Sequence, residues 1–238
     1  MVSKVLKKIS LFCMIAVLFF CCKEQFVQAE LVGPDVCGEG YCVLNWETGE
    51  VVLSKNKDEK LYPASITKVL TALVVVENVE DLNEIVTFSD YAIESLTSNS
   101  STLNPVAQIG EQMTVYDALH GMLLISGNEC ATALAEHVAG SEEAFAKMMT
   151  ERAKEIGANN SNFVNAHGLH HDEHYTTPYD MALIFCEALR NERFSEIIQT
   201  VDYVIPATNK TAARILKMGH AMVNGTEHYE DMGRGSNL

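Results

Sequence analysis

Ser65 and Lys68 are separated by two residues in the stretch LYPASITKVLTALVVVE, residues 61–77. A serine hydroxyl is a weak nucleophile at neutral pH and needs a base beside it. Because positions i and i+3 of a helix share a face, the lysine amine could take the serine proton, provided that burial lowers the lysine pKa. The alternative is that Ser65 only caps the helix, since Ser-x-x-Lys is common by chance and Ser is a favoured N-cap residue.

A second polar group, Ser126-Gly127-Asn128, interrupts a helical pattern. In a turn between two helices both polar side chains can face a cleft. Ser126 could then relay a proton to a leaving group, and the Asn128 amide could hold a substrate carbonyl. The alternative is an ordinary helix–helix turn with a capping asparagine.

The elements that would position these groups form a β-hairpin followed by a helical body. Alternation around Gly49 predicts a hairpin of residues 41–46 and 50–54. Apolar spacing predicts helices at 65–78, from Thr114, at 129–138, 141–156 and 177–189, and a short helix at 193–199. The first helix has almost no polar face and should be buried all round. Residues 95–104 and the polar stretch around residues 159–178 are expected to be loops, and residues 202–208 are expected to be extended.

The amino terminus has the pattern of a secretory signal peptide. Lys4, Lys7 and Lys8 precede an apolar run at residues 9–22, and the small residue Ala29 fits a cleavage site. We therefore expect residues 1–29 to be a leader and the protein to be exported; an uncleaved anchor is the alternative. Loss of the leader would take the formal net charge from −15 to about −18, which argues against nucleic-acid partners.

Cysteines and histidines suggest no cofactor. Export permits disulfides, so Cys37 and Cys42 could pair, whereas Cys130 and Cys186 fit apolar helical positions. No Cys-x-x-Cys pair and no Gly-rich phosphate loop is present. Four histidines cluster near Asp172, namely His167, His170, His171 and His174, but their spacing fits no helical zinc motif. We expect no metal.

Three segments together resemble one enzyme family. YPASITK, LLISGNECATALAEH and NAHGLHHDEHYTTPYDMALI are similar, in order and spacing, to the D-alanyl-D-alanine carboxypeptidases, the low-molecular-weight penicillin-binding serine peptidases. The likeness covers residues 39–227. It implies an α+β fold of the β-lactamase and penicillin-binding-protein type, with residues 30–238 as a partial carboxypeptidase domain.

The resemblance also implies a mechanism. Ser65 would attack the penultimate D-Ala carbonyl of a peptidoglycan stem peptide ending in D-Ala-D-Ala, and Lys68 would take its proton. Ser126 would relay protons and Asn128 would clamp the substrate, while His167 would support the site and the other three histidines would lie in an exposed loop. Penicillin and other β-lactam antibiotics would acylate the same serine.

This sequence departs from the family pattern in two places. Ala166 replaces the usual proline before His-Gly-Leu, which is a mild change. No Lys-Thr-Gly follows: Lys210-Thr211 is succeeded by Ala212 and lies too early. That element belongs to a sheet strand that binds the substrate carboxylate and adds an oxyanion donor, and losing one such donor costs about 10²–10³ in rate. We therefore expect a truncated member, with the remainder of the antiparallel sheet missing and with little or no carboxypeptidase activity.

Two other functions stay open at the level of sequence. A class A β-lactamase shares Ser-x-x-Lys, but Gly127 replaces the usual aspartate and no deacylating glutamate can be identified. A non-catalytic exported binding protein would keep the helical body without the chemistry. Nitrocefin hydrolysis, D-Ala release and penicillin labelling separate the three functions.

Overall fold

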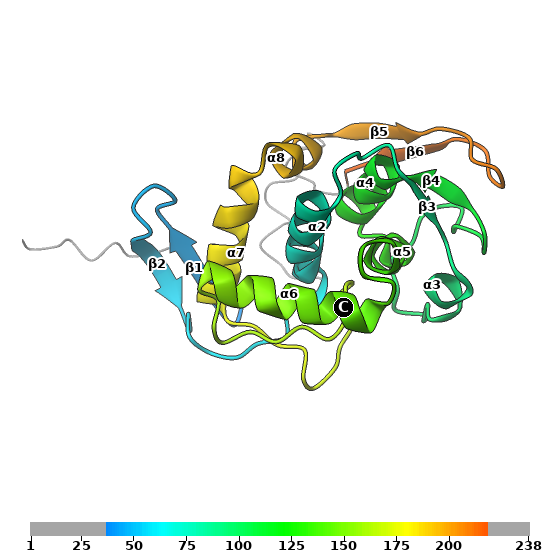
Figure 1. The fold of residues 1–238 in the computed structure, drawn as a ribbon. Helices are drawn as coiled ribbons and strands as arrows, with labels where there is room; N and C mark the ends of the chain where they lie inside the picture. The colour runs from blue at the N-terminus through cyan, green and yellow to red at the C-terminus, as the bar shows by residue number, and fades with distance from the viewer. Residues whose placement is uncertain (1–36, 219–238) are drawn as a thin grey trace, which may run out of the picture. The chain divides into compact units, whose positions relative to one another are not determined.

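The computed structural model describes residues 37–218, which form seven α-helices, one 3₁₀ turn and three two-stranded antiparallel sheets (Figure 1). In chain order the elements are β1 (Tyr41–Leu44), β2 (Val51–Lys55), η1 (Ala64–Ile66), α2 (Thr67–Asn78), β3 (Ile85–Thr87), α3 (Asp90–Glu94), β4 (Gln112–Thr114), α4 (Val115–Ile125), α5 (Asn128–Ala139), α6 (Glu142–Ile156), α7 (Pro178–Arg190), α8 (Glu192–Ile198), β5 (Asp202–Ile205) and β6 (Arg214–Lys217). The expected leader lies outside the described residues. Among the described helices, none has the length and apolar character needed to span a bilayer.

The α+β class, the hairpin and the main helices are confirmed. Strand β1 pairs with β2 around the turn at Gly49, with an irregularity between Val43 and Leu44. Thr114 caps α4 through a capping box with Asp117, and Thr177 caps α7 just before Pro178. Gly157 ends α6 in the left-handed conformation.

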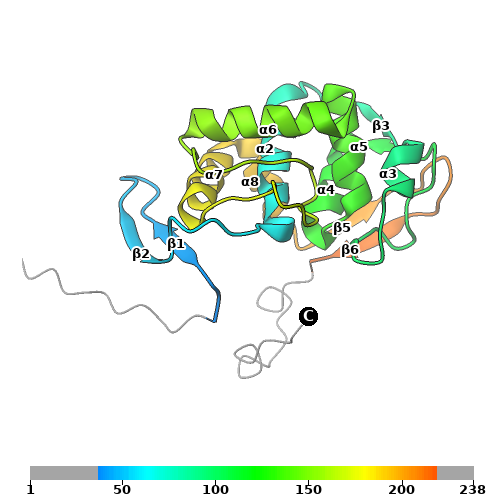
Figure 2. The same ribbon diagram turned by 90° about the horizontal axis from the view of Figure 1, so that it is seen from below.

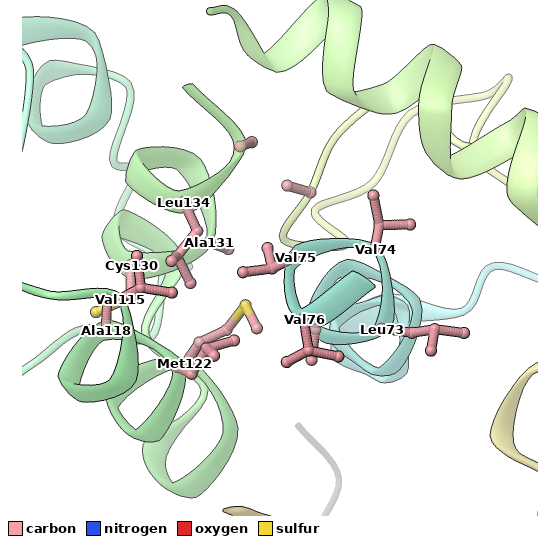
Figure 3. Close-up of a cluster of buried hydrophobic side chains, with 14 of the residues drawn as sticks. Leu73, Val74, Val75, Val76, Val115, Ala118, Met122, Cys130, Ala131 and Leu134 are labelled. Carbon is pink, nitrogen blue, oxygen red and sulfur yellow. The ribbon is translucent and has the colours of Figure 1, made fainter. Parts of the chain in front are cut away.

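Helix α2 is the centre of the core. Its residues Leu70, Ala72, Leu73, Val74 and Val75 are each at most 1% exposed. Helices α4, α5, α6 and α7 all contact it, as Figures 1 and 2 show from two directions. In Figure 3 the side chain of Val75 points toward Ala131 of α5 and Met122 of α4. Because a helix that is apolar on most sides must be covered on most sides, the packing of these helices holds α2 firmly in place.

Several short elements were not expected from the sequence. Strands β3 and β4 pair over three residues each, which is too short to show an alternating pattern. Helix α3 has only five residues. Strand β6 pairs with β5, and in it Arg214 and Leu216 point inward. An arginine at an inward position conceals the hydrophobic alternation on which strand prediction depends.

The buried Arg214 is matched by Glu111, in the loop before β4. Their side chains are 0% exposed and make two hydrogen bonds, of 2.7 and 3.1 Å, and the Arg214 Nε–H donates to the carbonyl oxygen of Pro105 at 2.8 Å. Burial raises the pKa of Glu111, but hydrogen bonds from Arg214, Gln108 and Thr208 outweigh it and lower the pKa to about 2. These contacts hold β6 against the loop before β4.

Candidate active site

Ser65 lies in the 3₁₀ turn η1, directly before α2. The sequence prediction placed it in the first turn of one helix, whereas α2 itself begins at Thr67 with Ile66 as its N-cap. Neither η1 nor α2 has a side-chain capping bond, so the interpretation of Ser65 as an N-cap is wrong. Ser65 is exposed, and its hydroxyl oxygen instead accepts hydrogen bonds from two side chains of the site.

The first of these donors is Lys68, which is 3% exposed. Its Nζ donates to Ser65 Oγ at 3.2 Å, to Asn128 Oδ1 at 2.8 Å and to the His167 carbonyl oxygen at 2.7 Å. The three acceptors match the three protons of an ammonium group and fix its direction. Burial lowers the pKa of Lys68 to about 8, although the carboxyl of Glu129 and the thiol of Cys130 oppose the shift. A buried lysine with such a pKa is suited to act as a base.

The second donor is Ser126, whose hydroxyl donates to Ser65 Oγ at 3.0 Å. Ser126 ends α4 in the left-handed conformation, at φ 62°, which is rare for a residue other than glycine. Strained backbone of this kind is concentrated at functional sites. The next two residues complete the turn, since the Gly127 N–H donates to the Gly121 carbonyl oxygen and the Asn128 N–H donates to the Ser101 carbonyl oxygen. The turn thus presents Ser126 and Asn128 to Ser65 and Lys68.

The segment at residues 165–169 forms the third wall. Its Gly168 has φ +88°, and a Cβ there would lie 2.5 Å from the Ala64 carbonyl carbon and still closer to its oxygen. Asn165 closes the turn, accepting from the Gly168 N–H and donating to the Leu169 carbonyl oxygen. The close approach to Ala64 brings the His167 carbonyl to Lys68. The sequence prediction placed His167 in this supporting position but gave no indication that its backbone, rather than its ring, contacts the lysine.

The His167 side chain is 13% exposed, and its partial burial together with the charge of Lys68 lowers its pKa to about 4. The imidazole is therefore neutral at pH 7. Its Nδ1 accepts from the Leu169 N–H, so that Nε2 carries the proton and faces a carboxylate oxygen of Glu142 at 3.4 Å.

One histidine expected in an exposed loop is buried. His174 is 1% exposed; its Nδ1 accepts from the Val164 N–H and its Nε2 lies 2.9 Å from Thr67 Oγ1. Burial lowers its pKa to about 4. His170 and His171 are exposed, as expected. The burial of His174 was missed because a loop has no periodicity from which burial can be inferred.

Glu142 was also missed by sequence reasoning. It is 8% exposed and follows the N-cap of α6, where an acidic residue is common for reasons of helix electrostatics alone. No sequence signal distinguishes it from its exposed neighbour Glu143.

The described residues contain no cluster of three or more metal-ligating side chains. Their four cysteines are free thiols, so the suggested pairing of Cys37 with Cys42 is not present in this structure.

An apolar pocket of about 570 Å³ lies between β1, the start of α2 and α7, and Tyr62, Ile66 and Phe185 are among the residues that line it. Ser65, Lys68, Ser126 and Asn128 are not among its lining residues.

Comparison with known proteins identifies the family of the chain. The model of the D-alanyl-D-alanine carboxypeptidase family matches residues 26–228. The chain is 38% identical to the carboxypeptidase DacF of Bacillus subtilis over 169 residues, which are 69% of this chain and 42% of DacF. It is 34% identical to DacC of Escherichia coli over 68% of this chain and 40% of that relative. The chain thus spans about two fifths of the length of these curated relatives.

Solved structures give the same fold. The structure resembles penicillin-binding protein 5 from Haemophilus influenzae, with a TM-score of 0.72 and 26% identity, over 82% of this chain and 56% of the other. It also resembles the Streptomyces K15 DD-transpeptidase, with a TM-score of 0.73 and 25% identity, over 83% of this chain and 79% of the other. The expected penicillin-binding-protein type of fold is confirmed.

Proposed function

Because this chain belongs to the D-alanyl-D-alanine carboxypeptidase family of serine peptidases, we propose that it acts on stem peptides ending in D-Ala-D-Ala through an acyl-enzyme on Ser65. One observation carries the proposal: the exposed Ser65 hydroxyl lies 3.2 Å from Lys68 Nζ and 3.0 Å from Ser126 Oγ. These are hydrogen-bonding distances, as expected for a nucleophile with its base.

Lys68 is the general base. With a pKa of about 8, about one lysine in ten is neutral at pH 7, compared with fewer than one in a thousand at an unperturbed pKa. The neutral amine takes the Ser65 proton as Oγ bonds to the penultimate D-Ala carbonyl carbon. The tetrahedral species then collapses, its C–N bond breaks, and the proton reaches the departing D-Ala amine through Ser126. Water cleaves the resulting ester and restores Ser65.

Asn128 has two functions in this scheme. Its side-chain oxygen accepts from Lys68 Nζ at 2.8 Å, which leaves its amide NH₂ group free to donate to a substrate carbonyl oxygen. β-Lactam antibiotics enter by the same route, since Ser65 opens the lactam amide and retains the acyl group. The substrate is a cell-wall peptide, so we place the protein on the extracytoplasmic side.

The experiment is labelling of the exported chain with fluorescent penicillin, combined with measurement of D-Ala release from a diacyl tripeptide. We expect both signals to require Ser65 and to disappear in Ser65→Ala. Nitrocefin turnover without D-Ala release would instead indicate a β-lactamase, and a folded chain that shows neither labelling nor release would indicate a non-catalytic binding protein.

A further inference from the structure

Glu142 is a buried carboxylate that does not contact Ser65 or Lys68 directly. It stands at the first position of α6. Its Oε1 accepts from the Ala166 backbone N–H at 3.1 Å, and its Oε2 accepts from the Tyr91 hydroxyl at 3.0 Å. Both oxygens therefore have a donor, and the one bonded to Ala166 also faces the His167 ring.

Ala166 and His167 connect this carboxylate to the base. The Ala166 carbonyl oxygen accepts from Thr71 Oγ1 at 2.7 Å, and the His167 carbonyl oxygen accepts from Lys68 Nζ at 2.7 Å. Thr71 and Lys68 belong to α2, whereas Glu142 belongs to α6. The two-residue segment is thus held from α2 through its carbonyl oxygens and from α6 through its N–H. Without Glu142 the buried Ala166 N–H would lose its partner, and an unpaired buried donor is costly.

We propose that Glu142 is a positioning residue for Lys68, which fixes the Ala166–His167 segment so that the His167 carbonyl aims Nζ at Ser65. This inference rests on the proposed function of Lys68 as the base. Glu142 acts through the backbone and touches no reacting atom. Its loss should therefore affect the step that uses the base more than the initial binding of substrate or penicillin.

The test compares Glu142→Ala, Glu142→Gln and Glu143→Ala in the full chain. Glu143 is the matched control, because it is adjacent and acidic but its side chain is 82% exposed and bonds only to Lys147 among the described residues. A misplacement on the order of 1 Å costs about 10²-fold in rate. We expect a loss of that order in the penicillin acylation rate of Glu142→Ala, with little change in the concentration for half-saturation.

Glu143→Ala should acylate like wild type. Glu142→Gln should recover most of the rate, because its amide oxygen can still accept from the Ala166 N–H and its NH₂ group can donate to the Tyr91 oxygen. A purely structural role for Glu142 would instead lower the amount of folded protein without changing the rate constant of the folded fraction.

A second measurement does not depend on activity. The Lys68 amine is titrated by NMR, and exchange of the Ala166 amide is followed in the same samples. In Glu142→Ala we expect faster Ala166 exchange and a Lys68 pKa that rises from about 8, because water reaches Nζ and relieves the burial that lowers it. If wild type is not acylated at all, the proposed function fails, while this titration still decides the role of Glu142.

Glu142→Asp covers the case in which Glu142→Ala does not fold. It keeps the charge at the start of α6, but its side chain is one methylene shorter and draws back from the Ala166 N–H. We expect it to shift the Lys68 titration in the same direction as Glu142→Ala. A folded Glu142→Ala or Glu142→Asp variant with the wild-type Lys68 pKa and the wild-type acylation rate would overturn the proposal.

Discussion

Gly168→Ala is the substitution for which the structure gives the most definite expectation. Gly168 has φ +88°, a left-handed conformation that costs an alanine about 1–2 kcal/mol. The added Cβ would also lie 2.9 Å from Thr67 Oγ1 and 2.5 Å from the Ala64 carbonyl carbon. Ala64 begins η1 and Thr67 begins α2. Neither neighbour can move as the end of a long side chain can.

Overpacking of this kind typically costs about 1–3 kcal/mol. The two contributions together predict that Gly168→Ala lowers the free energy of unfolding by about 2–5 kcal/mol. Gly140→Ala is the matched control, because Gly140 has φ +78° and a Cβ there would meet nothing within 4 Å. It should lose only the backbone contribution, about 1–2 kcal/mol.

Urea unfolding monitored by circular dichroism measures both free energies. The rate of acylation of the folded fraction is a second measurement, because a shift of residues 167–168 away from Ala64 also moves the His167 carbonyl away from Lys68. We expect Gly168→Ala to acylate more slowly and Gly140→Ala to acylate like wild type. Equal losses of stability in the two variants would refute the argument, because they would show that the approach to Ala64 imposes no steric requirement.

Four further predictions follow from groups described above. The acylation rate of wild type should rise with pH through about 8, because Lys68 loses its proton there, and should level off at higher pH. An acylation rate that does not change between about pH 6 and 9 would contradict the role of Lys68 as the base. Arg214→Met should lower the unfolding free energy by about 3–5 kcal/mol because it leaves Glu111 buried and unpaired, and adding Glu111→Gln should recover part of the loss in urea titrations. Because folding lowers the pKa of Glu111, its carboxylate stabilises the fold at pH values above its pKa in the unfolded chain. This stabilisation should fade as the pH falls from about 4.5 toward 2, and acid unfolding of wild type compared with the Arg214→Met/Glu111→Gln variant measures it. Thr114→Ala should cost about 0.5–2 kcal/mol through loss of the α4 capping box, whereas the same change at the exposed Thr48 should cost less.

The parts of the fold that could be predicted are those whose signal is local. A few neighbouring residues are enough to predict the cap at Thr114, the end of α6 at a glycine and the buried helix α2. The three-residue strands β3 and β4 have no such signal, because their pairing joins segments more than twenty residues apart. Strand β6 was hidden by Arg214, whose burial makes sense only once Glu111 is known to lie opposite.

The candidate site shows the same division. Ser65, Lys68, Ser126 and Asn128 could be singled out because each belongs to a short motif, and the structure brings them together. The roles of the Ala166 N–H and the His167 carbonyl could not be predicted, since backbone groups carry no residue signature. Glu142 contacts Ala166 and His174 contacts Thr67, both of which are distant in sequence. The residues around Glu142 resemble an ordinary helix start, and those around His174 resemble an ordinary polar loop.

The placement of Lys68 also links its chemistry to the folding of the chain. Ser65 and Lys68 are neighbours along the chain in any conformation, but the burial that lowers the lysine pKa comes from α5 and residues 166–168, which are distant in sequence. In an unfolded chain the amine would return to its ordinary pKa of about 10.4, and Ser65 would have no effective base at neutral pH. A penicillin label on Ser65 would therefore be a conformational probe, which marks only molecules whose helices have docked and could be used to count the native fraction during export or refolding.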